Sequence, residues 1–122
     1  MATLEPDVLQ GSLAKLIGDN PAIDGAAIVS PDGLILVSTF RDKDLNDRMA
    51  AMTSEMLAAG NMTVRELEHG PFFLNLVFGT QGGVIVRGVD EEMVLCAIMK
   101  RTANVGQVVQ QVNQTVSRIL AA

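Results

Sequence analysis

The residues best suited to chemistry in this chain of 122 residues are its single histidine, His69, and its single cysteine, Cys96. A Cys–His pair or a Ser–His–Asp triad needs side chains within hydrogen-bond reach of one another. His69 precedes Gly70 and Pro71 in a predicted loop, whereas Cys96 lies in the middle of a predicted strand. We therefore expect an exposed histidine, a buried and inert thiol, and no catalytic residues; the chain is predicted not to be an enzyme.

Two further segments have the composition of ligand sites. Residues 79–83 are glycine-rich, but a phosphate-binding loop needs a following lysine and a helix, so this segment predicts a hairpin turn. Residues 90–92 are acidic, but no neighbouring acidic loop completes a cation site, so they predict a solvated turn. One cysteine and one histidine do not make a zinc site. We expect no cofactor and no metal.

The charge of the chain limits its partners. The formal net charge is -5, the aromatic content is 3%, and Lys100 and Arg101 form the one basic pair. Nucleic acids and anionic membrane surfaces both require a basic surface, so neither is an expected partner. No apolar run is long enough to insert into a membrane. A lone cysteine and an acidic start, with Glu5 and Asp7 but no base in residues 1–7, predict a cytoplasmic location without a signal peptide.

The apolar content is high for the size of the chain. Hydrophobic residues make up 48% and charged residues 19%. The length suits a single domain, residues 1–122, that buries about two thirds of the surface of its unfolded chain. A surplus of apolar surface on a small domain predicts a subunit interface.

Hydrophobic spacing predicts helix, strand, strand, helix, strand, strand, strand, helix. The first helix is predicted at residues 6–17, and a hairpin at 23–40 turns at Ser30-Pro31-Asp32-Gly33. The second helix is predicted from about 45 to 59, with Asp44 as its cap and Gly60 as its stop. Residues 63–68 fit either a helix tail or an extended piece.

The second half of the sequence predicts three strands and a helix. The strands are expected at residues 72–78, 84–87 and 93–99, and tight turns join them into an antiparallel meander. The last helix is predicted at residues 102–120, with Thr102 as its cap. The simplest packing is an α+β layer fold, in which helices lie on the faces of one antiparallel sheet.

Two apolar surfaces have more than one interpretation. The second helix has a stripe at heptad spacing, formed by Leu45, Met49, Met52, Met56 and Ala59. This stripe either packs on the sheet as core or contacts a partner, for which methionine is well suited. The strand at 72–78 is apolar on both faces, so either it is central or another chain covers its edge.

Several short motifs occur in a particular order along the chain. They are Ile23-Asp24-Gly25-Ala26, Ser30-Pro31-Asp32-Gly33-Leu34, Gly70 and Ala103-Asn104-Val105-Gly106. The middle helix is rich in alanine and methionine, and the final helix is long. Over about residues 9–120, the order of these features resembles the Roadblock / dynein-light-chain family, and the long final helix resembles its prokaryotic branch associated with small GTPases.

The resemblance implies a Roadblock / profilin-like fold: a five-stranded antiparallel sheet with two helices on one face and one on the other. It also implies a homodimer that joins through the middle helices and the third strands. Carried over to this chain, the implied dimer contacts are Leu45, Met49, Met52, Met56, Phe72, Leu74, Leu76 and Phe78.

The resemblance further implies a partner, a Ras-like small GTPase whose nucleotide cycle or location this chain would modulate without catalysis of its own. The implied docking surface is the solvent face of the paired middle helices, with Arg48 and Glu55. The arginines at 41, 48, 87 and 101 could reach a bound nucleotide, but surface charge is their expected role. The alternative is a structural dimerisation scaffold in a motor or signalling complex, with no dependence on nucleotide state.

Overall fold

The computed structural model describes residues 5–122. Its elements are α1 (Pro6–Asp19), β1 (Ile23–Val29), β2 (Ile35–Ser38), α2 (Lys43–Glu66), β3 (Leu74–Gly79), β4 (Gly82–Gly88), β5 (Val94–Lys100) and α3 (Val105–Ala121). The expected order of elements is confirmed. Residues 1–4, which entered the expectation about a signal peptide, lie outside the described residues. Within residues 5–122, no helix combines the length and apolarity needed to cross a bilayer.

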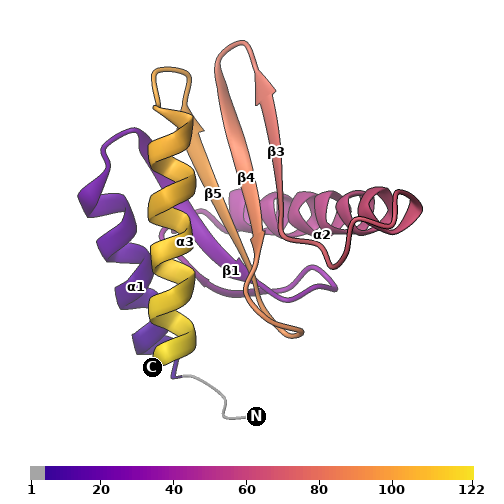
Figure 1. Ribbon diagram of the computed structural model, residues 1–122. Helices are drawn as coiled ribbons and strands as arrows, with labels where there is room; N and C mark the ends of the chain where they lie inside the picture. The colour runs from indigo at the N-terminus through magenta and orange to yellow at the C-terminus, as the bar shows by residue number, and fades with distance from the viewer. Residues whose placement is uncertain (1–4) are drawn as a thin grey trace.

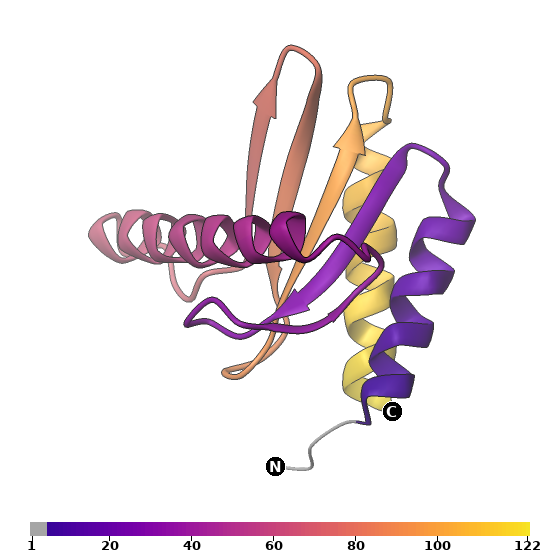
Figure 2. The same ribbon diagram turned by 180° about the vertical axis from the view of Figure 1, so that it is seen from behind.

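The strands form one antiparallel sheet in the order β2-β1-β5-β4-β3. Helices α1 and α3 lie on one face, and α2 crosses the other face alone (Figure 1, Figure 2). Each face has its own core, one around Leu13 and Ile85 beneath α1 and α3, the other around Val86 and Cys96 beneath α2. The predicted fold class is therefore confirmed.

The turn between β1 and β2 follows the prediction. Gly33 donates its backbone N–H to the Ser30 carbonyl at 3.0 Å and has a φ of +91°, a conformation that favours glycine. Beyond the turn, β2 has only 4 residues and forms one edge of the sheet. Gln10 of α1 donates from Nε2 to the Ser38 carbonyl at 2.8 Å. The first helix thus supplies a hydrogen bond to this edge strand.

Helix α2 starts earlier and ends later than predicted. Its N-cap is Asp42 rather than Asp44, because Asp42 Oδ1 accepts the backbone N–H groups of Asp44 at 2.9 Å and Leu45 at 3.4 Å. Gly60 does not stop the helix, and it has no positive φ. A Cβ at Gly60 would lie 2.7 Å from Cδ1 of Phe72. Gly60 therefore allows Phe72 to pack closely against the helix, and it does not mark the end of the helix.

The C-terminus of α2 has the two hydrogen bonds of a Schellman motif. Glu68 donates its backbone N–H to the Arg65 carbonyl at 3.1 Å, and His69 donates to the Val64 carbonyl at 2.9 Å. Glu68 occupies the left-handed position with a φ of 55°, where glycine is usual. The ambiguous segment 63–68 is thus helical through Glu66.

Other boundaries also differ from the expectations, and α1 extends to Asp19. β3 begins at Leu74, after Phe72 and Phe73, and the glycine-rich turn is shorter than predicted because β4 already begins at Gly82. The cap of α3 is Asn104 instead of Thr102, since Asn104 Oδ1 accepts the backbone N–H of Gln107 at 3.0 Å. The preceding residues form a turn instead, closed by the Ala103 N–H on the Lys100 carbonyl at 3.1 Å.

Candidate interaction surface

Helix α2 is held across the sheet by polar contacts at its N-terminal end and in its middle. They are Asn46 Nδ2 to the Phe40 carbonyl at 3.0 Å, Ser54 Oγ to the Pro31 carbonyl at 2.9 Å, and Asn75 Nδ2 to the Met56 carbonyl at 3.1 Å. Each joins the helix to a different loop or strand. These contacts fix the direction in which α2 runs over the sheet.

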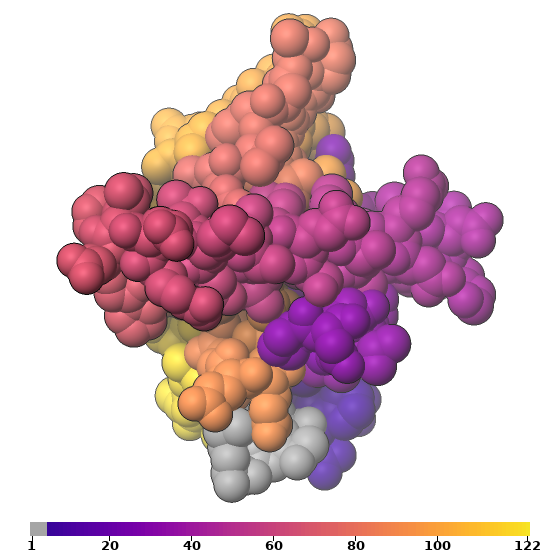
Figure 3. Space-filling view, turned by 90° about the vertical axis from the view of Figure 1, so that its right-hand side faces the viewer, coloured from indigo at the N-terminus to yellow at the C-terminus, as the bar shows by residue number. Residues whose placement is uncertain are grey.

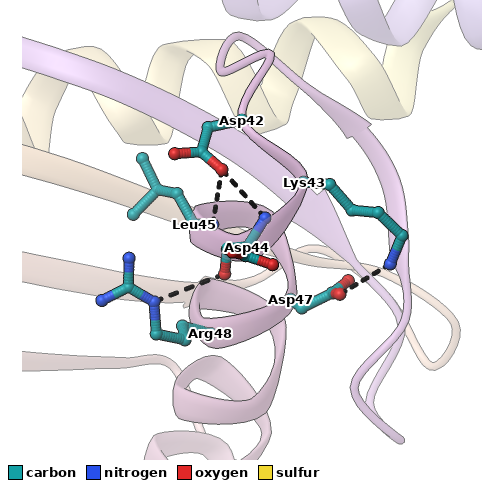
Figure 4. Close-up of polar contacts among 6 residues, drawn as sticks. All are labelled: Asp42, Lys43, Asp44, Leu45, Asp47 and Arg48. Atoms are coloured by element: carbon teal, nitrogen blue, oxygen red, sulfur yellow. Dashed lines mark hydrogen bonds and ion pairs between the residues drawn. The ribbon is translucent and has the colours of Figure 1, made fainter.

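The first turns of α2 carry a cluster of charges (Figure 4). Lys43 Nζ and Asp47 Oδ2 are 2.8 Å apart on the surface, and the hydrogen bond and charge of Asp47 raise the pKa of Lys43. Arg48 points away from that pair and donates from Nε to the Asp44 carbonyl at 3.4 Å (Figure 4). Arg48 and Glu55, the predicted docking residues, are both exposed.

The methionine stripe of α2 faces the sheet. Met49 is only 2% exposed and belongs to the core beneath α2, while Leu45, Met52 and Met56 are half-buried against the same core. The core interpretation therefore holds for Met49, which has no free surface to offer a second chain, and we exclude it from the interface proposed below. Contact of the other three with a second chain remains a prediction.

The predicted interface residues of the third strand are more accessible. Phe72, Leu74 and Leu76 are half-buried, and Phe78 is 47% exposed. The predicted set contains the even-numbered positions of this strand and does not include Val77, which is 51% exposed. The alternation of strand side chains could have found it, because Val77 faces opposite to Leu76 and Phe78.

A row of apolar side chains lies beside α2 without a helix over it. Val77, Val84 and Ile98 are neighbours across β3, β4 and β5. Val77 is 51% exposed, and Val84 and Ile98 are half-buried at the margin of the core beneath α2. The next row of that face, Asn75, Val86 and Cys96, lies beneath α2. In Figure 2 the ends of β3 and β4 extend past α2, and in Figure 3 their hairpin projects beyond the band that α2 forms.

The C-terminal part of α2 extends beyond the sheet. In both ribbon views the helix runs past β3, which is an edge strand with a partner on one side only (Figure 1, Figure 2). Met62, on this overhanging part, is 64% exposed. A hollow of about 170 Å³ in the angle between helix and strand is lined by Ala59, Gly60, Thr63, Val64, Phe72, Leu74 and Asn75. The molecule thus has an overhanging helix, an open strand edge and an uncovered apolar row on adjoining surfaces.

The candidate chemical groups do not come together. His69 is exposed in the loop after α2, whereas Cys96 is fully buried in β5. Burial raises the pKa of the Cys96 thiol, an effect that the neighbouring Thr53 hydroxyl partly offsets. Across the described part of the chain, no three His, Cys, Asp or Glu side chains group as metal ligands would. The predicted absence of catalytic and metal-binding residues remains a prediction.

A sheet flanked by two helices on one face and a single crossing helix on the other defines a Roadblock / profilin-like layer protein. The chain belongs to the Roadblock/LC7 domain family, whose sequence model matches residues 9–99. The recognition made from short motifs is therefore confirmed. No protein of curated function matches this chain.

Several solved structures share the fold. A Roadblock/LC7 domain from Streptomyces avermitilis superposes with a TM-score of 0.86 at 19% identity, covering 92% of this chain and 94% of that one. MglB of Myxococcus xanthus gives 0.84 at 17% identity, with 98% and 90% covered. Profilin IA of Acanthamoeba castellanii gives 0.62 at 13% identity, with 92% and 96% covered. These likenesses establish the fold of this chain.

Proposed function

We propose that two copies of this chain pair through α2 and the edge of β3, and that the pair is a non-catalytic adaptor for a Ras-like small GTPase. It would modulate the nucleotide cycle or the location of that GTPase. The observation that carries the proposal is the uncovered apolar row Val77, Val84 and Ile98 beside α2. Exposed apolar surface on this row would be buried by a second helix, and the overhanging part of α2 has exposed apolar surface that a second sheet would bury.

A two-fold axis beside β3 meets both needs at once. Antiparallel pairing of β3 with the β3 of a second copy would satisfy the open backbone edge and join the two sheets. The overhang of each α2 would then lie across the sheet of the other copy. Such an interface is isologous, so it uses the same residues twice and closes at two copies.

The spacing of the sheet suits a second helix. Rows that share a face are two residues apart along a strand, which is about 7 Å. Packed helices lie about 8–10 Å apart between axes. A helix seated beside α2 would therefore lie over the row Val77, Val84 and Ile98. The proposed interface consists of this row, Met62, the half-buried residues of the α2 stripe, and β3 with Phe72, Leu74, Leu76 and Phe78.

Val77→Lys tests the pairing without disturbing the core, because Val77 is 51% exposed in the single chain. We expect the wild type to have the mass of two chains by light scattering and Val77→Lys to have the mass of one, with an unchanged circular dichroism spectrum. Val8→Lys is the matched control, since Val8 is a 40% exposed valine on α1, on the other face of the sheet. A folded Val77→Lys variant that stays dimeric would show that the pairing lies elsewhere.

The GTPase would dock on the outer side of the paired α2 helices. Arg48 and Glu55 are exposed there and lie two helical turns apart, so they point to the same side. The support for this partner comes from membership of the Roadblock family, whose members commonly bind small GTPases.

Binding to the purified Ras-like GTPases of the source organism, each loaded with GDP or a GTP analogue, tests this docking. We expect one of them to form a complex that depends on the nucleotide and that Arg48→Glu weakens. Lys15→Glu, on α1 of the opposite face, should leave the complex intact. Equal binding in both nucleotide states would instead favour the structural scaffold, and binding to none would contradict the GTPase proposal while leaving the dimer untouched.

A further inference from the structure

The face of β3 that points away from α2 carries a second apolar surface. By the register of the strands, Leu76 and Phe78 share this face with Ile85 and Arg87 of β4. Phe73, just before β3, lies beneath Arg87, with the guanidinium carbon 4.1 Å from the ring centre. Phe73 is 51% exposed and Phe78 47%. We refer to Phe73, Leu76, Phe78 and Arg87 as the β3 strip.

Helices α1 and α3 cover this face of the sheet only in part. Leu76 packs against the core beneath them and Arg87 contacts Asn113 of α3, whereas Phe73 and Phe78 remain about half exposed. β3 and β4 are visible beside α3 in the view from this face (Figure 1). The ring of Phe78 lies close to Gly83, where a Cβ would be 3.1 Å from Cγ of Phe78. The absence of a side chain at Gly83 therefore leaves room for the ring against β4. The apolar surface of the β3 strip is thus already formed in the single chain.

Arg87 gives the β3 strip a positive charge without an acidic partner. Its Nε donates to Asn113 Oδ1 at 2.8 Å, and its Nη1 donates to the Gly88 carbonyl, so both of its bonds are to neutral groups. Burial lowers the pKa of Arg87, and the ion pairs found among residues 5–122 all involve lysine. A guanidinium has five N–H donors, so three remain for a ligand.

The surroundings of Arg87 reinforce its charge. β3, β4, β5 and α3 contain no aspartate or glutamate, although the net charge of the chain is -5. The acids closest to Arg87 in sequence, residues 90–92, lie in the β4–β5 turn and form no ion pair with it. A half-buried arginine stacked on an aromatic ring is well suited to bind a carboxylate in a bidentate manner.

We infer that the β3 strip docks an amphipathic, acidic segment of a partner protein. The apolar side chains of that segment would cover Phe73, Leu76 and Phe78, and one of its carboxylates would pair with Arg87. Because the β3 strip and the outer side of α2 lie on opposite faces of the sheet, one molecule could hold this segment and another partner at the same time. The inference does not depend on the proposed GTPase. Leu76 and Phe78 also belong to the proposed dimer interface, whereas Phe73 and Arg87 do not, so the Arg87 variants test the β3 strip separately from the dimer.

Selection from a displayed library of random 16-residue peptides tests the inference with the wild-type protein as bait. We expect the selected peptides to combine leucine or aromatic residues with glutamate or aspartate. Their affinity should fall about tenfold or more in Arg87→Gln, which loses a charged hydrogen bond. Arg87→Lys, which keeps the charge and loses the planar fork, should be intermediate, and Phe78→Ser should also weaken binding.

Two matched controls separate the β3 strip from general effects. Leu36→Ser removes a 45% exposed leucine from β2 at the other edge of the sheet, and Arg48→Gln removes a charge from α2. Both should bind the peptides like the wild type, and circular dichroism should show every variant folded. Selection of basic peptides, selection of none, or affinities that Arg87→Gln and Phe78→Ser leave unchanged would overturn the inference. Binding to anionic vesicles that depends on Arg87 would assign the β3 strip to a membrane and also overturn it.

Discussion

Replacing Gly60 with alanine has two opposite effects on stability: helix propensity favours the alanine, whereas packing against Phe72 disfavours it. Alanine in a helix interior is favoured over glycine by about 1 kcal/mol. The new Cβ, however, would lie 2.7 Å from Cδ1 of Phe72 and closer still to Cε1. The ring must then move, and overpacking of this kind costs about 1–3 kcal/mol. We expect Gly60→Ala to lower the free energy of unfolding by up to about 2 kcal/mol.

Gly11→Ala in α1 is the matched control, because a Cβ at Gly11 meets nothing within 4 Å. It should gain the full propensity term of about 1 kcal/mol. Thermal unfolding at one fixed protein concentration measures both, with a shift of about 3–6 °C for each kcal/mol in a domain of this size. We therefore expect the two glycine variants to shift in opposite directions.

A double-mutant cycle isolates the cause. In a Phe72→Ala background the ring is gone, so Gly60→Ala should become stabilising by about the same 1 kcal/mol as at Gly11. If Gly60→Ala raised the melting temperature of the wild type as much as Gly11→Ala does, close packing would not be the reason for this glycine. The outcome also bears on the proposed pairing, because the contact between Gly60 and Phe72 joins the overhang of α2 to the start of β3.

Three further predictions concern single side chains and are checked by urea unfolding. Thr53 is fully buried, and its hydroxyl has no hydrogen bond of good geometry, so Thr53→Val should stabilise the fold by about 1 kcal/mol; a loss of stability would mean that the hydroxyl is satisfied. Glu68 has a left-handed φ of 55°, a conformation that costs less for glycine. Glu68→Gly should therefore stabilise the fold by about 0.5–1 kcal/mol, a net gain that allows for the larger conformational entropy of glycine in the unfolded chain. No gain would argue against strain at this residue. Burial raises the pKa of Cys96, so on raising the pH the thiol ionises in the unfolded chain before it does so in the folded protein, from about pH 8.5. The free energy of unfolding should therefore fall above that pH by up to about 1.4 kcal/mol per pH unit. Cys96→Ala should lack that decline, and an equal decline in both proteins would contradict it.

The hydrophobic pattern was sufficient to predict every element of the fold. The stripe of α3 is buried as its spacing predicts, with Val108, Val112 and Val116 all in the core. Element ends were less predictable, because neighbouring polar residues compete for the cap position. Asp42 and Asp44 both suit an N-cap, and only the backbone hydrogen bonds of the first turn show which one serves.

The roles of Gly60 and of the methionine stripe could not be predicted from neighbouring residues in the sequence. A glycine in a helix can mark a C-terminus or a close approach, and at Gly60 the choice depends on Phe72, which is distant in sequence. Heptad spacing is the same for a stripe that faces a sheet and one that faces a partner, so the burial of Met49 could not be read from the pattern. The exposure of Val77 could not be predicted, because an all-apolar strand does not indicate which of its faces is covered.

The two edges of the sheet are unequal. β2 is short, its register with β1 shifts near the turn, and Gln10 already supplies a hydrogen bond to the Ser38 carbonyl. β3 has no comparable cover on its outer side. Two equivalent open edges would let copies add to each other without limit and form a fibre. If copies pair through β3 as proposed, the short β2 edge offers no equivalent second site, so assembly would stop at two copies.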